Sequence, residues 1–275
     1  MGLRARGPGF RFTGVTLALK EFRMCGRYTL RTRGRAKPYG VPASQLPWAE
    51  LLLSEFLTSE RLHPAPRYNI APSQMVPVIV SEQWAVGDEQ SGHGGEERRH
   101  VAMFQWGLVP SWSTDANGFI NARAETLEEK PSFAESFLRR RCLIPADGFY
   151  EWKRKGKWKQ PYFFQLQDES QFAFAGIWDR WERADRSITS CAIITTTPNE
   201  LLSEIHDRMP VILSDSDQEA WLRHDADPRE LKALLAPYPA GAMKSFPVSE
   251  KVNSALVDEA QLVEPIELQP ELRLF

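Results

Sequence analysis

Compact apolar runs along the chain predict a series of β-strands. Six segments concentrate Val, Ile and aromatic residues between polar or Gly-containing stretches, namely residues 75–80, 101–109, 141–152, 161–167, 172–181 and 189–196. Runs of this composition and length are typical of strands. Gly156 lies in the middle of 153–159, which favours a hairpin tip there. The polar, Gly-rich segment 81–100 has no such pattern and predicts a long hairpin loop.

Helices are predicted between and before these strands. Leu46, Ala49, Leu52, Leu53 and Phe56 have the spacing of an amphipathic helix over residues 44–56. Four short segments begin with a capping residue and carry an acid within three positions, which is the signature of a helix start. They open at Ser132 (running toward Arg140), Thr197, Ser216 and Asp227.

Strands joined mostly by hairpins, with helices interspersed, predict an α+β fold. We expect a single domain over residues 24–264, built on a mainly antiparallel, barrel-like β-sheet with peripheral helices. Residues 265–275 then form a tail. The sequence contains no internal repeat and no linker that would divide the domain.

Composition narrows the function classes. The net charge is −2 with 25% charged residues, so any nucleic-acid site has to be a local basic patch. Three cysteines at wide spacing do not suggest a disulfide framework, and five scattered histidines form no zinc-like cluster. We therefore expect no metal and no cofactor. No apolar run approaches the ~20 residues that a membrane span needs.

The first 23 residues differ from the rest. They carry Arg4, Arg6 and Arg11 around a Gly-Pro-Gly break, with no acid before Glu21. This composition is weakly similar to a transit peptide. A pro-segment is a second interpretation. The third, which we prefer, is a start codon assigned too early, because the well-patterned sequence begins at Met24.

Cys25 follows Met24 directly, and this position has distinctive chemistry. If everything through Met24 is removed, an α-amine and a thiol stand on adjacent carbons. The amine can condense with an aldehyde to a Schiff base, and the thiol can then close a five-membered thiazolidine. The two groups titrate near pH ~8 and ~8.5, so both nucleophiles are present at neutral pH. For a lone cysteine, a small buried strand residue is the competing interpretation.

Eight motifs in a fixed order resemble the SRAP family, whose members recognise abasic sites in single-stranded DNA and crosslink to them through an N-terminal cysteine. They are MCGRY (24–28), RYNIAPSQ (67–74), WGLVPSW (106–112), INARAET (120–126), DGFYEW (147–152), KQPYF (159–163), IHDRMP (205–210) and FPVSEKVN (246–253). They span nearly the whole chain from Met24 onward. The departure is the extension of 23 residues, which would block the Cys25 amine.

The resemblance implies four catalytic residues. Cys25 would be the nucleophile. Asn121 would hydrogen-bond near its amine and the sugar, since an amide donates and accepts at once. Glu151, between two aromatic residues that should desolvate it and raise its pKa, would act as a general acid and assist removal of the residue before Cys25. His206 would shuttle protons in the Schiff-base chemistry. A strand at 205–210 would point Asp207 away from His206.

Without the resemblance, each of these residues has an ordinary structural interpretation. Asn121 suits a turn or a cap. Glu151 suits the outward face of a strand. His206 suits a loop or the core.

The resemblance also suggests DNA contacts. Arg27, Arg123 and Arg208 each lie two residues from a proposed catalytic group, and guanidinium groups bind phosphate oxygens in a bidentate manner. Salt-bridged surface arginines are the competing interpretation. Trp112 is the better candidate for stacking on a base, whereas Trp106 suits the core. Two basic groups, 139–141 and 153–159, fit a DNA-binding rim or a solvated face equally well.

The expected function is covalent capture of abasic single-stranded DNA by a monomer, during the DNA-damage (SOS) response, in the cytoplasm or at a bacterial nucleoid. Self-removal of the residues before Cys25 and weak lyase activity are further expectations. Two other functions stay open. One is a cysteine peptidase or amidase that uses Cys25 with His206. The other is a non-covalent single-strand binder, whose affinity would depend steeply on salt.

Overall fold

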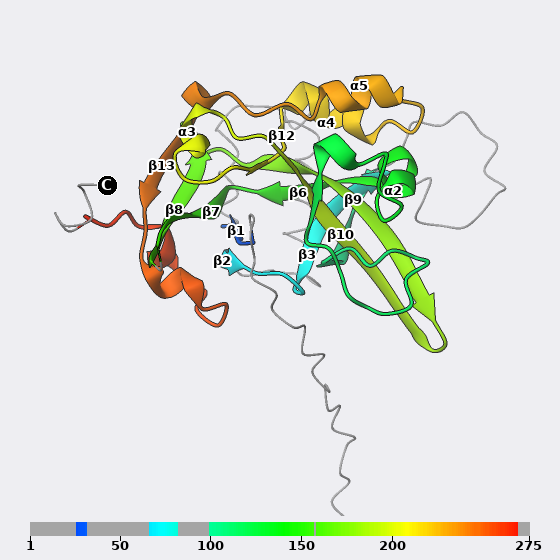
Figure 1. Ribbon diagram of the computed structural model, residues 1–275, viewed down its shortest axis with the longest axis horizontal. Coiled ribbons are helices and arrows are strands. Elements are labelled where there is room, and N and C mark those ends of the chain that lie inside the picture. The colour runs from blue at the N-terminus through cyan, green and yellow to red at the C-terminus, as the bar shows by residue number, and fades with distance from the viewer. Residues whose placement is uncertain (1–25, 32–65, 82–98, 157, 269–275) are drawn as a thin grey trace, which may run out of the picture.

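The computed structural model describes residues 26–31, 66–81, 99–156 and 158–268 (Figure 1). Cys25, the extension 1–23, the helix predicted over 44–56 and most of the loop predicted over 81–100 lie outside the described residues. The remaining predicted strands and helices can be compared with the structure directly.

Five strands close into a barrel. Their order is β10-β4-β3-β6-β9, and β9 pairs with β10 to complete the ring. The strands are β3 (Met75–Ser81), β4 (Arg99–Trp106), β6 (Arg141–Ala146), β9 (Phe172–Arg183) and β10 (Arg186–Thr196). Every pairing in the ring is antiparallel except that of β10 with β4, so the predicted mainly antiparallel barrel is confirmed.

Three very short strands attach to this barrel. β5 (Asn121–Arg123) runs parallel to the last residues of β10, and β11 (Met209–Pro210) pairs with the end of β10 in the antiparallel sense. β12 (Ile212–Leu213) pairs with β9. The end of β10 therefore lies between two segments that are far apart in the sequence.

The second sheet is wholly antiparallel, in the order β13-β8-β7-β1-β2. Its strands are β1 (Tyr28–Leu30), β2 (Arg67–Ile70), β7 (Gly148–Lys155), β8 (Trp158–Leu166) and β13 (Met243–Pro247). The sequence predicts one strand over 141–152, but the chain leaves the barrel after β6 and enters this sheet as β7. Asp147 is the single residue between them.

One apolar cluster fills the space between the barrel and the second sheet. Tyr28 and Phe149 come from the sheet, and Trp106 and Phe174 come from the barrel; all four side chains are buried. The Tyr28 ring packs edge-on against Trp106 with centroids 5.3 Å apart, and Phe174 packs edge-on against Phe149 at 6.0 Å. Burial of each such side chain stabilises the fold by about 1.5–3 kcal/mol, so this cluster joins both sheets into one domain.

The helices are short and peripheral, as predicted. They are α2 (Ala134–Arg139), α3 (Glu200–Ser203), α4 (Asp215–Leu222) and α5 (Pro228–Ala233), with 3₁₀ turns η3 (Ala124–Thr126), η4 (Ala240–Ala242), η5 (Glu250–Asn253) and η6 (Ala260–Val263). The pair α4 and α5 lies along one side of the barrel in Figure 1. Among the described helices, none is long and apolar enough to cross a membrane.

The helix starts differ in detail from the prediction. Asp227 caps α5 as expected, by accepting a hydrogen bond from the Arg229 amide. The other three predicted caps are wrong. Asn199 rather than Thr197 caps α3, because its side chain accepts a hydrogen bond from the Leu202 amide in the first turn. Ser214 rather than Ser216 caps α4, because its side chain accepts from the Asp217 amide. α2 begins after Phe133 with no side-chain cap, so Ser132 does not serve as one.

We predict that Trp106→Phe lowers the free energy of unfolding by about 2–4 kcal/mol. The indole is 1% exposed and donates through Nε1 to the Ile120 carbonyl at 2.9 Å. The phenyl ring therefore leaves a void and removes one of the two hydrogen bonds that this carbonyl accepts, the other coming from the Ile193 amide. Urea titration measures the change. Trp112→Phe, at a side chain that is 58% exposed, is the control and should stay within about 0.5 kcal/mol. Equal losses in the two variants would contradict the assignment of Trp106 to the core.

Candidate functional site

The pairing of β1 with β7 brings two of the sequence motifs together. Tyr28 stands opposite Phe149, and the Tyr150 amide donates to the Arg27 carbonyl at 3.0 Å. The same register, continued by two residues, brings Gly26 level with Glu151. Gly26 is buried, and Glu151 is only 2% exposed. The expected burial of Glu151 is thus confirmed, and the residue is level with the chain that follows Cys25.

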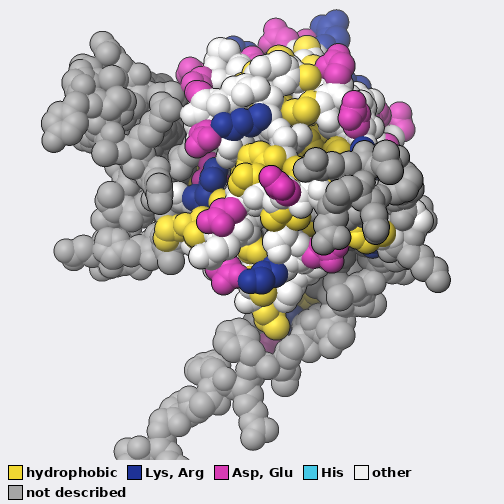
Figure 2. Space-filling model, turned by 90° about the vertical axis from the view of Figure 1, so that its left-hand side faces the viewer, with side chains coloured by type: hydrophobic (Ala, Val, Ile, Leu, Met, Phe, Trp, Pro, Cys, Tyr) yellow, Lys and Arg dark blue, Asp and Glu magenta, His cyan; other side chains and the backbone are white. Residues whose placement is uncertain are grey.

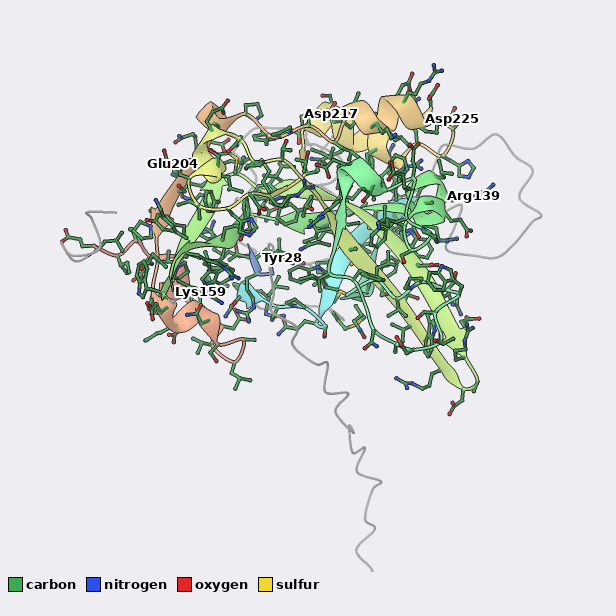
Figure 3. The ribbon with its side chains drawn as sticks, in the orientation of Figure 1. Tyr28, Arg139, Lys159, Glu204, Asp217 and Asp225 are labelled. Carbon is green, nitrogen blue, oxygen red and sulfur yellow. The ribbon has the colours of Figure 1, made fainter. Side chains whose placement is uncertain are left out.

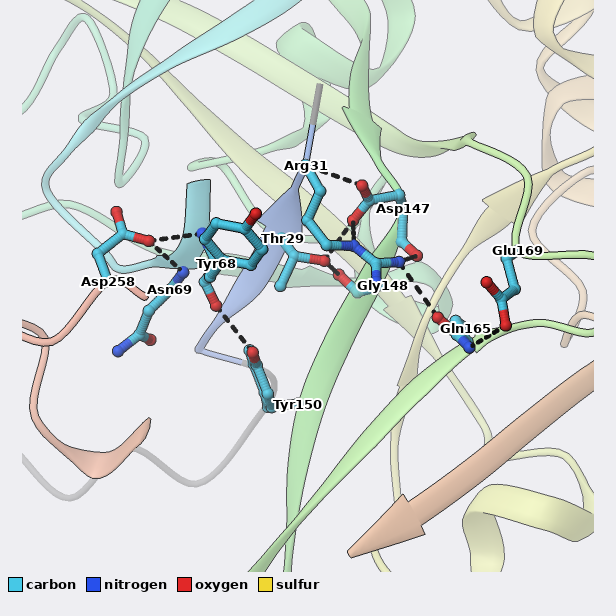
Figure 4. A network of polar contacts seen from close by, with 10 residues as sticks. All are labelled: Thr29, Arg31, Tyr68, Asn69, Asp147, Gly148, Tyr150, Gln165, Glu169 and Asp258. Atoms are coloured by element: carbon cyan, nitrogen blue, oxygen red, sulfur yellow. Dashed lines mark hydrogen bonds and ion pairs between the residues drawn. The ribbon is translucent and has the colours of Figure 1, made fainter. Parts of the chain in front are cut away.

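Asp147 fastens β1 in this position (Figure 4). Its carboxylate is buried and accepts hydrogen bonds from the Thr29 hydroxyl and from the Arg31 amide, the latter at 2.6 Å. The Arg31 Nε lies 3.1 Å from the same carboxylate. A buried carboxylate is stable only when such partners compensate its desolvation, so the three contacts define one position for β1.

Arg31 connects this clamp to the rest of the second sheet. Its guanidinium donates to the Gln165 side chain at 3.1 Å and lies over the Phe163 ring, 5.3 Å from the centroid. Gln165 in turn donates to Glu169 (Figure 4). Glu169 also accepts from Lys244. The clamp on β1 is therefore part of a network that reaches β8 and β13.

The end of β10 brings the other two motifs together. Asn121 on β5 stands beside Ile193, and Arg123 stands beside Thr195. On the opposite edge of the same strand, Thr195 faces Pro210 of β11. The Arg208 guanidinium crosses this end and donates to the Thr195 carbonyl at 2.6 Å. Residues 120–126 and 205–210 thus meet around one strand end, although about 80 residues separate them in the chain.

Glu125 binds Arg208 in a bidentate manner, with Nη1 and Nη2 at 2.6 and 2.8 Å from its two carboxylate oxygens. These hydrogen bonds hold the pKa of Glu125 below its usual value. The charge of Arg208 is therefore largely neutralised within the protein. Arg123, which comes two residues before Glu125, is exposed to solvent.

His206 lies in the bend between α3 and β11. Its side chain is 12% exposed, and its Nδ1 lies 3.1 Å from the Arg208 amide and 3.1 Å from an Asp207 carboxylate oxygen. A neutral ring can accept the amide hydrogen at Nδ1, whereas a protonated ring can donate from Nδ1 to Asp207. Both protonation states therefore have a partner. The expectation that Asp207 points away is wrong, because residue 207 is in a bend and not in a strand.

Trp106 links the two halves of the site. Its ring packs on Tyr28 of β1, and its Nε1 donates to the Ile120 carbonyl, immediately before Asn121. Figure 3 shows Tyr28 between the second sheet and the barrel, with Glu204 of the α3 end on the second-sheet side. The position of Trp106 in the core is confirmed, and its role is to fix the spacing between the two halves.

Trp112 lies in a loop, residues 107–119, that several hydrogen bonds hold in place. Leu108 and Phe119 exchange two backbone hydrogen bonds across its base. The Ser111 amide donates to the buried Asp179 carboxylate at 2.8 Å, and the Trp181 indole donates to the Ser113 carbonyl at 2.9 Å. The Trp112 side chain itself is exposed, as predicted, on a backbone that is already ordered.

A C-terminal segment covers the far edge of the second sheet. The buried side-chain amide of Asn69 donates to the carbonyls of Val252, Ser254 and Val257. The Asp258 carboxylate accepts from the backbone amides of Tyr68 and Asn69. Arg27 donates to the Val252 carbonyl at 2.8 Å. The Arg27 guanidinium is therefore half-buried against this segment, and burial lowers its pKa.

The other two cysteines are unsuited to nucleophilic chemistry. Cys142 and Cys191 are free thiols, both fully buried in the barrel. Burial raises the pKa of each thiol, so neither forms the thiolate at neutral pH. No group of three or more potential metal ligands occurs within the residues that the structure describes.

On the face in Figure 2, the described residues form no large field of one sign. Figure 2 shows acidic and basic side chains interspersed with apolar ones on the face beside the second sheet. This mixture agrees with the net charge of −2. Any nucleic-acid contact on the described surface therefore depends on individual residues rather than on the charge of the whole protein.

Comparison with known families decides the relationship. The family described as SOS response associated peptidase (SRAP) matches residues 24–255. The chain belongs to the SRAP family. Its relatives include the abasic site processing protein YoqW of Bacillus subtilis, 40% identical over 247 residues, which are 88% of this chain and 99% of YoqW.

More distant relatives share the same name. The abasic site processing protein YedK of Escherichia coli is 31% identical over 74% of this chain and 86% of its own, and the abasic site processing protein HMCES of Gallus gallus is 32% identical over 89% and 79%. A crystal structure of a Bacteroides thetaiotaomicron protein superposes with a TM-score of 0.64 at 29% identity, covering 73% of this chain and 86% of that one.

The structure places the predicted site residues in two groups, and it distinguishes those bound to protein groups from those that face solvent. Asn121, Arg123, His206 and Arg208 surround the end of β10, whereas Glu151 lies on β7 beside Gly26. Arg27 and Arg208 are fastened to protein groups, while Arg123 and Trp112 face solvent. Three supporting residues are absent from the sequence-based prediction: Asp147, Asn69 and Glu125. Their only signal was membership of the motifs, because their partners lie 80 to more than 180 residues away.

We predict that Asp147→Ala lowers the free energy of unfolding by about 2–4 kcal/mol, since the Arg31 amide loses its acceptor and the buried Thr29 hydroxyl keeps only the Gly148 carbonyl, at 3.3 Å. Adding Thr29→Val should cost less in this background than in the wild type, because the two residues share one hydrogen bond. Chemical denaturation measures all four proteins. Asp225→Ala, at an exposed acid, is the control, and fully additive losses would contradict the clamp.

A second prediction concerns pH. The folded pKa of Glu125 is below its unfolded value of about 4.3, so its ion pair with Arg208 adds stability above that pH and loses it as the pH falls through the folded value. Glu125→Gln should therefore be less stable than the wild type by about 0.5–1 kcal/mol at pH 6–7, after allowance for solvent screening, with the difference vanishing in acid. Urea titrations from pH 3 to 7 measure it. Glu129→Gln, at an exposed acid, should show no such trend.

Proposed function

We propose that this protein processes abasic sites in single-stranded DNA by forming a covalent thiazolidine between Cys25 and the ring-opened sugar aldehyde. The observation that carries the proposal is the fixed position of β1, which brings Gly26 level with the buried Glu151. Cys25 is joined to Gly26 by one peptide bond, so its Cα stands about 3.8 Å from that of Gly26. The names of the family relatives support the same class of substrate.

The chemistry proceeds in two steps. The Cys25 amine adds to the aldehyde carbon, and the resulting carbinolamine loses water to give an imine. The thiol then adds to the imine carbon and its proton passes to the nitrogen, which closes the five-membered ring. One water is released overall. Because the ring ties up the aldehyde carbon, the strand is protected from the elimination that a free abasic aldehyde undergoes.

Glu151 and His206 are proposed to move the protons. A buried carboxyl level with Gly26 is suited to protonate the departing hydroxyl of the carbinolamine. His206 has a partner for Nδ1 in both of its charge states, so it can accept and return a proton without losing its position. Asn121, half-buried at the end of β10, is proposed to orient the amine and the sugar.

The contacts with DNA divide into two groups. Arg123 and Trp112 face solvent, so we propose that they bind a phosphate and stack on a base, respectively. Arg27 and Arg208 already donate to Val252, Thr195 and Glu125. They are proposed to shape the walls of the site, with Arg27 adding positive potential beside Cys25 and the guanidinium of Arg208 touching the lesion strand.

Self-removal of the residues before Cys25 belongs to the same proposal, because the α-amine must be free for the imine to form. Glu151 is proposed to assist this step. We further propose weak lyase activity when the imine does not close, a monomeric state, and a cytoplasmic or nucleoid location in the DNA-damage response.

A gel assay tests the proposal with a single-stranded oligonucleotide that carries one abasic site. The wild type should give a heat-stable shifted band, and Cys25→Ala should abolish it. Cys25→Ser keeps the amine and should give no heat-stable band unless borohydride reduces the imine. Glu151→Gln and His206→Ala should slow crosslinking by about 100-fold or more, with non-covalent affinity retained. Crosslinking by Cys25→Ala at the wild-type rate would overturn the mechanism.

Two controls separate the competing functions. Oligonucleotide whose abasic aldehyde has been reduced beforehand should bind but not crosslink; crosslinking to it would exclude the imine route. Intact-mass measurement of the chain expressed from Met1 should show loss of residues 1–24 in the wild type and their retention in Glu151→Gln. Cleavage of added peptides by the wild type would instead indicate a general cysteine peptidase.

A further inference from the structure

We propose that Arg183 and Arg186, on the tip of the β9–β10 hairpin, bind the phosphate backbone of single-stranded DNA where it leaves the lesion site past Trp112. This inference rests on the proposed function and extends it to the nucleotides that flank the lesion. The hairpin runs out from the barrel beyond the other strands, and its tip is its far end in Figure 1. All residues from Glu182 to Ser187 are exposed.

The two arginines stand directly opposite each other across the hairpin, so their side chains lie on one face of it. Two like charges that stand directly opposite each other destabilise a hairpin. When no acid of the protein neutralises such a pair, it indicates a site for an anion from outside the chain. No ion pair between either arginine and an acid occurs among the described residues, although Asp185 is in the turn between them. An anion from outside the chain would relieve the repulsion.

The two faces of the hairpin differ in charge. On the opposite face, Arg180 forms an ion pair with Glu182 at 2.6 Å, so that face is neutralised internally. On the face of Arg183 and Arg186, the cross-strand neighbours are Trp181 and Ile188. The Arg186 guanidinium lies over the Trp181 ring, 5.9 Å from its centroid, which holds it in place without consuming its hydrogen-bond donors.

The same face borders the loop that carries Trp112. Arg183 donates to the carbonyls of Trp112 and Ser113 at 3.2 and 3.1 Å, and Trp181 donates to Ser113. The exposed Trp112 indole, its proposed stacking surface, and the two guanidiniums are therefore parts of one continuous surface. Aromatic stacking beside cationic side chains that follow the backbone is how proteins bind single strands without reading sequence.

Salt dependence of binding to a lesion-free single-stranded oligonucleotide tests this inference. Each phosphate contact adds about 0.7 to the magnitude of the slope of log K against log salt for single strands. Arg186→Ala should lower that magnitude by about 0.7 and weaken binding severalfold at low salt, whereas Arg186→Lys, which keeps the charge, should retain the slope. Arg186 is the decisive position, because its side chain makes no hydrogen bond to the backbone of the described residues that its loss would remove.

Arg183→Ala should lower the slope by a similar amount and weaken binding further, since it also releases the Trp112 loop. Arg229→Ala is the matched control: it removes an exposed arginine from α5, and its slope should equal that of the wild type. Circular dichroism and urea titration check that each variant is folded. Weaker binding of Arg183→Ala with unchanged slopes in both hairpin variants would show that Arg183 only braces the loop, and would overturn the inference.

The lesion-free probe keeps this test separate from that of the proposed function. If Cys25→Ala fails to crosslink and the hairpin variants keep the wild-type slope, the covalent mechanism stands and the hairpin inference is wrong. If Cys25→Ala crosslinks normally and the slopes fall, the hairpin binds DNA but the thiazolidine mechanism is wrong.

Discussion

The buried carboxylate of Asp147 is the interaction on which the site depends. It is the single residue between β6 of the barrel and β7 of the second sheet, and it holds β1 through the Thr29 hydroxyl and through the amide and Nε of Arg31. Removing a carboxylate from water is unfavourable unless its oxygens find donors, so the chain can satisfy Asp147 only by placing β1 in this register. That register sets Gly26 level with the buried Glu151.

A second constraint is the end of β10, which lies between β5 and β11. The end of a barrel strand can bring together side chains from remote segments, because short strands from elsewhere in the chain pair with whichever of its edges is still free to form hydrogen bonds. Here the arrangement gives Asn121 and His206 a common anchor, while Glu125 takes up the charge of Arg208. The site is therefore less cationic than a count of its arginines suggests, and Arg123 is the arginine left open to solvent.

Rigidity extends to the surface. The loop that presents Trp112 is tied by Asp179, Trp181 and Arg183, so the exposed indole is held on an ordered backbone. A binding surface that is ordered before the ligand arrives loses less conformational entropy on binding. The same bonds place the hairpin tip beside Trp112, so that the single strand of the proposed function would have a continuous surface to follow.

The longer strands, the peripheral helices and the family were determined by the sequence, because β-branched runs, capping signals and eight ordered motifs are local properties of the chain. The division of one apolar run at Asp147 was not, since a strand that changes sheets has the same local pattern as one that does not. Nor could the sequence distinguish an arginine that faces solvent, such as Arg123, from one bound by a carboxylate, such as Arg208. The positions of Asp207, Glu125 and Arg183 depend on partners contributed by bends and strands elsewhere, and only tertiary packing decides which side chains those partners meet.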